Sequence, residues 1–155
     1  MGIGFINYLL ASIISYLGLL IGVILIKMAP EEQKHGKKHF ILLKKILFFI
    51  IFIPILYFYG INIIFSLALL FFIVALMVSN KIRLDKTSSV YMLLGILFAV
   101  SRKFIDLFAI ESVLILLYGV PTASLMLSIK KKNYYGIFIK NLWFFIPAVT
   151  LYFIF

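Results

Sequence analysis

Residues 46–79 read ILFFIIFIPILYFYGINIIFSLALLFFIVALMVS and carry no charged side chain over 34 positions. A single helix of this length would measure about 51 Å, whereas the hydrocarbon core of a bilayer is about 30 Å thick. We therefore predict that this stretch crosses a membrane twice. The turn is expected at Gly60-Ile61-Asn62, where glycine and asparagine interrupt the hydrophobic pattern and Tyr57 and Tyr59 suit the membrane interface.

The composition of the whole chain agrees with this interpretation. The 155 residues are 65% hydrophobic and only 13% charged, whereas about a quarter of the residues of a soluble domain are charged. So little polar surface cannot cover a water-soluble globule, so the fold class is predicted to be an all-α integral membrane protein. Cysteine is absent, which excludes disulfides, thiolate catalysis and cysteine-based metal sites.

The basic residues predict the orientation in the membrane. Thirteen of the fifteen Lys and Arg residues lie around residues 27–45, 80–86 and 130–140, in the polar gaps between hydrophobic runs. Short loops rich in Lys and Arg stay on the cytoplasmic side. We therefore expect a multi-pass protein of the cell membrane, with both termini on the non-cytoplasmic side. The net charge of +10 predicts contact with the lipid bilayer and with anionic headgroups at the cytoplasmic face, and no nucleic acid is expected as a partner.

These runs predict a six-helix transmembrane bundle with short loops, formed by a single domain over residues 1–155. A count of five, with residues 46–79 as one span, would move the basic gap at residues 80–86 to the opposite side and break the charge rule. Six spans satisfy it. Their expected bounds are residues 3–26, 42–59, 61–79, 88–104, 110–129 and 137–155.

Small residues follow one face of the first span. Ala11, Ser15, Gly18 and Gly22 are spaced by four, three and four positions, which stacks them on one side of a helix and lets another backbone approach closely. Similar pairs occur at Gly95/Ala99 and Gly119/Ala123. Two interpretations are open: packing within the chain, or a seam for a homo-oligomer or a larger membrane complex.

A second pattern is the charged group Arg102, Lys103, Asp106 and Glu111. Charged residues at membrane depth are costly and are often functional, whereas at the interface they simply mark a turn. Two interpretations are again open: a polar pocket that opens to the outer face, or an ordinary turn. On a continuous helix Arg102 and Asp106 would share a face and could pair. Two carboxylates alone do not define acid–base catalysis, so no catalytic residue is assigned.

Glu31, His35 and His39 are spaced by four residues in the first basic gap, which is compatible with a metal site on one helix face. The neighbouring lysines would repel a cation, so the candidate is weak and we expect neither a metal nor a cofactor. A lipid-facing amphipathic stretch explains the region better.

Four residues are candidates for helix kinks. Pro54 lies within the second expected span (residues 42–59) and Pro147 within the sixth (residues 137–155). Gly119 and Pro121 lie within the fifth (residues 110–129), which we call run five. A proline frees a backbone carbonyl and bends or interrupts a helix. Run five is therefore the best candidate for a bent or broken element.

The sequence suggests three functions. The first is a small non-enzymatic transporter or channel-like protein, with the charged group around Arg102 at its outer mouth. The second is an accessory or assembly subunit of a larger membrane complex. The third is an intramembrane enzyme that acts on lipids, for which the sequence offers no recognisable catalytic motif.

Overall fold

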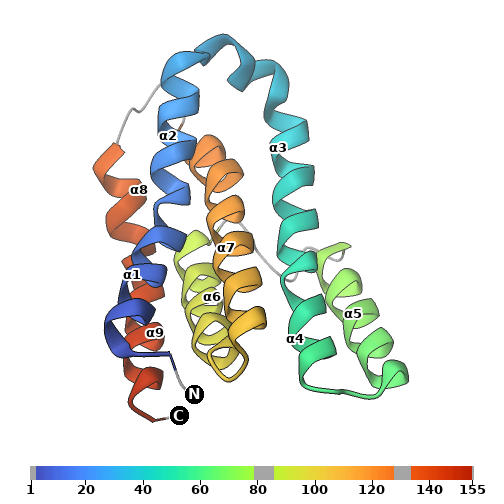
Figure 1. Ribbon diagram of the computed structural model, residues 1–155. Helices are drawn as coiled ribbons and strands as arrows, with labels where there is room; N and C mark the ends of the chain where they lie inside the picture. The colour runs from blue at the N-terminus through green and yellow to red at the C-terminus, as the bar shows by residue number, and fades with distance from the viewer. Residues whose placement is uncertain (1–2, 79–85, 128–133, 155) are drawn as a thin grey trace.

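The computed structural model describes residues 3–78, 86–127 and 134–154, and it is helical throughout, with no strand among these residues (Figure 1). The helices, in chain order, are α1 (Phe5–Tyr16), α2 (Gly18–Met28), α3 (Pro30–Ile50), α4 (Phe52–Phe58), α5 (Ile63–Val78), α6 (Thr87–Ser101), α7 (Ile105–Met126), α8 (Tyr134–Asn141), the 3-10 turn η1 (Leu142–Phe144) and α9 (Phe145–Tyr152).

Four helical segments are long and apolar enough to cross a membrane, which supports a helical membrane protein. They are Phe5–Met28, Gly36–Phe58, Ile105–Met126 and Tyr135–Tyr152. The other two runs form shorter apolar helices, α5 and α6. At 1.5 Å per residue the 15 residues of α6 extend over about 22 Å, less than the hydrocarbon thickness. The six-span topology therefore remains a prediction.

The helices run alternately up and down (Figure 1). Both ends of the chain lie at one end of the bundle, together with the turns at residues 59–62 and 102–104. We call this the terminal end. The connection from α2 to α3 lies at the opposite end, near the first nine residues of α3, which hold three of its five lysines, and we call this the lysine-rich end. The turn at residues 59–62 falls where residues 46–79 need to reverse, and Gly60 has φ +62°, a conformation that favours glycine.

Helix α7 is the centre of the bundle. It packs against α1, α2, α3, α4 and α6, while α6 also packs against η1 and α9. Buried aromatic rings fill the space at the terminal end, where Tyr8, Phe98 and Phe108 lie with their ring centroids 4.9–5.6 Å apart. The Tyr8 hydroxyl donates a hydrogen bond of 2.7 Å to the backbone oxygen of Ala148, which ties α1 to α9. Helix α5 packs against α3 at the edge of the molecule.

Small residues bring α2 and α7 into backbone contact. A methyl group added at Gly22 would lie 2.5 Å from the carbonyl oxygen of Val120, and one at Gly119 would lie 2.6 Å from the carbonyl carbon of Gly18. Ser15, one turn before Gly18, is also buried, and Ala11 packs against the core. The Gly18 and Gly22 face is therefore occupied by α7 of the same chain in this structure. A seam for a second copy at this face has no support here.

Interruptions of the helices lie close to two of the three candidate prolines. Helix α3 ends at Ile50, the residue whose carbonyl would accept the N–H that Pro54 lacks, and α4 begins two residues later. The turn η1 similarly precedes Pro147. In contrast, α7 continues as one helix through Gly119 and Pro121, so run five is not broken there, and a bend at these residues stays a prediction. Gly119 serves the close approach of α2.

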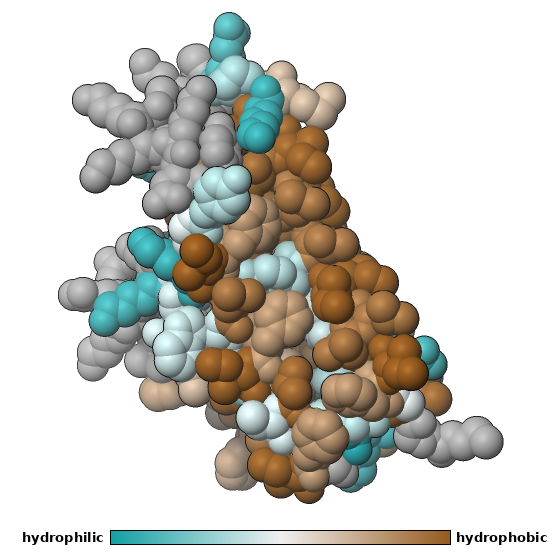
Figure 2. All heavy atoms as spheres, turned by 90° about the vertical axis from the view of Figure 1, so that its left-hand side faces the viewer, coloured by the Kyte–Doolittle hydropathy of each residue, from teal (hydrophilic) through white to brown (hydrophobic). Residues whose placement is uncertain are grey.

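The outer surface is strongly apolar. Figure 2 shows that hydrophobic side chains form a broad, continuous area on the face at the left of Figure 1. Large hydrophobic side chains are also exposed on α5, where Phe65 and Phe71 leave about three quarters of their surface uncovered. Soluble monomers rarely expose contiguous apolar patches larger than a few hundred Å². This surface is suited to lipid, in agreement with a multi-pass membrane protein.

Candidate functional site

Arg102 lies in the turn between α6 and α7 at the terminal end. Its Nη1 donates a hydrogen bond of 2.7 Å to the backbone oxygen of Tyr152, and its guanidinium lies 4.2 Å from the centroid of the Tyr152 ring. Helix α6 ends at Ser101 and α7 begins at Ile105, so no continuous helix places Arg102 and Asp106 on one face. Arg102 therefore binds the last turn of α9, and no ion pair between Arg102 and Asp106 is found among the described residues.

Lys103 and Asp106 are exposed. The Lys103 Nζ lies 5.5 Å from the centroid of the Tyr59 ring, and the Tyr59 hydroxyl donates a hydrogen bond of 3.0 Å to the backbone oxygen of Val100. These contacts connect the two turns of the terminal end. Three of the four predicted pocket residues therefore lie at the end of the bundle, where charges cost little.

Glu111 differs from these three residues because it lies inside the bundle. Its side chain is completely buried, and within the described part of the chain neither carboxyl oxygen has a hydrogen-bond partner. It lies seven residues beyond Phe104, which places it about 10 Å from the turn along the axis of α7. Its neighbours on the same face, one turn away, are the buried apolar residues Leu107, Phe108 and Ile115. An ionised carboxylate is costly in such surroundings unless a proton or a cation compensates it.

The same face of α7 carries further polar groups towards the lysine-rich end. Glu111, Tyr118 and Thr122 are separated by seven and four residues, so they lie nearly in line along the helix, and all three are fully buried. The ring of Tyr91 on α6 lies 6.1 Å from that of Tyr118. Thr122 lies beside both tyrosine hydroxyls, yet among the described residues neither hydroxyl has a partner at normal hydrogen-bond geometry. We call Glu111, Tyr118, Thr122 and Tyr91 the buried polar row.

The polar row extends over a substantial part of the bundle. Eleven residues separate Glu111 from Thr122, which corresponds to about 16 Å along the helix, roughly half the thickness of the hydrocarbon core. At the end of the row nearer the lysine-rich end, the Lys44 Nζ of α3 lies 5.9 Å from the centroid of the Tyr118 ring. Tyr91, Tyr118 and Thr122 were not predicted from the sequence to form part of a site. The spacing of Glu111, Tyr118 and Thr122 is the signal that could have identified two of them.

The other candidates lie outside this row. Glu31 and His39 are exposed, and the side chain of His35 lies outside the described residues. No group of three or more His, Cys, Asp or Glu side chains that could hold a metal ion is found in the part of the chain that was placed. The metal site on α3 therefore stays a weak prediction.

Comparison with known proteins gives no relative from which a role could be inferred. The chain matches no protein-family model, and neither the curated proteins nor the solved structures give a match to it.

Proposed function

We propose that this chain is a small six-span membrane transport protein that conducts protons, with Glu111 as the proton-binding group inside the bundle. The observation that carries the proposal is the complete burial of a carboxyl group with no hydrogen-bond partner among the described residues. Ionisable residues inside a membrane bundle are costly and commonly belong to ion or proton pathways. Removing such a group should improve stability, so its presence favours a functional explanation over a structural one.

The buried polar row supports a proton rather than a larger solute. Carboxyl and hydroxyl groups both accept and release protons through hydrogen bonds, and they follow each other along one face of α7. A proton is the ion that passes most readily between hydroxyl groups. Under this proposal Arg102, Lys103 and Asp106 surround the outer mouth.

The test is proton uptake by proteoliposomes that contain the purified full-length chain and an internal pH-sensitive dye, under an imposed membrane potential. We expect uptake by the wild type and its loss in Glu111→Gln, which keeps the shape of the side chain but cannot ionise. Glu31→Gln is the matched control, because Glu31 is an exposed carboxylate of α3 that lies outside both the buried polar row and the outer mouth, so its change should leave uptake intact. Equal uptake by wild type and Glu111→Gln would remove the basis of the proposal.

A further inference from the structure

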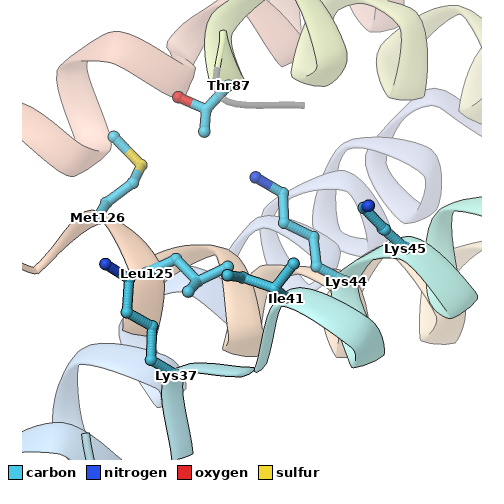
Figure 3. A pocket seen from close by; sticks show the side chains of 7 residues that line it. All are labelled: Lys37, Ile41, Lys44, Lys45, Thr87, Leu125 and Met126. Carbon is cyan, nitrogen blue, oxygen red and sulfur yellow. The ribbon is translucent and has the colours of Figure 1, made fainter. Parts of the chain in front are cut away.

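A pocket of about 360 Å³ lies between α3, the start of α6 and the end of α7 (Figure 3). This volume falls within the range of small-molecule sites, at its lower end. The pocket does not include Glu111, and nothing in the proposed proton pathway requires it to be filled. The described residues that line it are Lys37, Ile41, Lys44, Lys45, Thr87, Leu125 and Met126.

The polar side chains among the described lining residues are cationic or neutral. Of the seven described side chains that line the pocket, three are lysines, the fourth polar group is the hydroxyl of Thr87, and none is Asp or Glu. Lys37, Lys44 and Lys45 come from one face of α3, because seven or eight residues correspond to about two helical turns. Figure 3 shows Lys44 reaching from α3 into the space between Thr87 and Met126. Such a set of donors and positive charges selects an anion.

Lys44 makes this more than a group of surface lysines. Only 5% of its surface is exposed, whereas Lys37 and Lys45 are exposed. Its Nζ lies near the face of the Tyr118 ring, at 5.9 Å from the centroid. A cation over an aromatic face is held in place without losing its charge. Lys44 therefore places a buried positive charge at the wall of the pocket, and the exposed Lys37 and Lys45 add two more.

The other described lining residues are apolar, which limits the class of ligand that fits the pocket. Ile41, Leu125 and Met126 offer hydrocarbon contact beside the ammonium groups, so the pocket suits an anion joined to an apolar group. Basic pockets between membrane helices on the cytoplasmic side bind the headgroups of anionic lipids. Lysine is a common binder of phosphate. The positive-inside rule places this end of α3 on the cytoplasmic side, where anionic lipids are available.

We propose that this pocket binds the phosphate group of an anionic phospholipid at the cytoplasmic face. The same phosphate chemistry could also come from a water-soluble phosphate compound, and the experiment must separate these two sources. The test of this proposal is independent of proton conduction, because it measures lipid binding alone.

The experiment measures lipid retention by native mass spectrometry of the purified full-length chain, exposed to equal amounts of phosphatidylglycerol and phosphatidylcholine. We expect selective retention of phosphatidylglycerol and a loss of about tenfold in its apparent affinity in Lys37→Gln, because one charge-assisted contact is removed. Lys38→Gln is the matched control: Lys38 is the next residue on α3, is exposed and does not line the pocket. Lys44→Gln should lower retention further, but Lys37→Gln is decisive because an exposed side chain can be changed without disturbing the fold.

Each outcome decides the proposal. Retention that falls in Lys37→Gln but not in Lys38→Gln, and that excess inorganic phosphate does not change, supports a lipid in the pocket. Displacement of the lipid by inorganic phosphate supports the phosphate site and assigns it to a soluble ligand. Equal losses in Lys37→Gln and Lys38→Gln, or retention of both lipids alike, would overturn the proposal in favour of general surface charge.

Discussion

Gly119→Ala tests the contact between α2 and α7 that positions the buried polar row. In an ordinary helix interior, alanine is more favourable than glycine by about 1 kcal/mol. Here a methyl group at position 119 would lie 2.6 Å from the backbone carbon of Gly18 and from the backbone nitrogen of Leu19. Carbon atoms pack at about 3.5–4.0 Å, so the two helices would have to separate by about 1 Å.

The two opposing effects give the expected magnitude. Overpacking costs about 1–3 kcal/mol, and the upper part of that range applies because the obstacle is backbone rather than a side chain that can rotate. After the gain in helix propensity, Gly119→Ala should lower the free energy of unfolding by about 1–2 kcal/mol. For a chain of this size that corresponds to a decrease in Tm of about 2–8 °C, measured by thermal unfolding in detergent.

Gly36→Ala is the control, and its expected effect has the opposite sign. Gly36 lies within α3, and an added methyl group would meet only the ring of Phe40 at 3.1 Å, which can move aside. This variant should keep or raise the Tm through its helix propensity. If Gly119→Ala raised the Tm as much as Gly36→Ala does, α2 and α7 would not be in backbone contact, and the arrangement of α7 described above would be wrong.

Three further predictions concern the charges and the topology. Glu111→Met should raise the free energy of unfolding by about 1–3 kcal/mol, because it removes a buried polar group without a partner among the described residues; a lower Tm would show that the carboxyl group stabilises the fold. Arg102→Gln should speed hydrogen exchange in α9, because it removes the contacts with Tyr152; unchanged exchange would mean that these contacts contribute nothing. The chain has no cysteine, so an impermeant maleimide should label Ile61→Cys in intact cells but Lys38→Cys only after permeabilisation, and the reverse pattern would contradict the proposed orientation.

The positions of the helices could be predicted from hydrophobic runs, because each apolar stretch must be covered by lipid or by another helix. The interruption at Gly60 could be predicted for the same reason. The break at Ile51 could be predicted from Pro54, whereas the break at Leu17 could not, because it depends on how the helix fits against its neighbours. The small residues Gly18 and Gly22 indicated a close helix contact, but their spacing alone does not identify the partner, which is α7.

The candidate site could be predicted only in part. Arg102, Lys103, Asp106 and Glu111 are close in sequence, yet only Glu111 is buried. Five residues rotate a helix by about 140° from one face towards the opposite one, which separates Asp106 from Glu111. The residue at which α7 begins determines which of its side chains face the bundle, and the sequence alone does not fix that residue. The pocket around Lys44 joins three helices, so no local pattern could reveal it.

The most direct test of the central proposal is the initial rate of proton uptake by proteoliposomes as residue 111 is varied. Proton conduction through the buried carboxyl group predicts uptake by the wild type, reduced but measurable uptake by Glu111→Asp, and uptake at the level of empty liposomes by Glu111→Gln. Wild-type and Glu111→Gln proteoliposomes with the same rate would contradict it, provided that both proteins show the same helical content and elute as the same species in detergent.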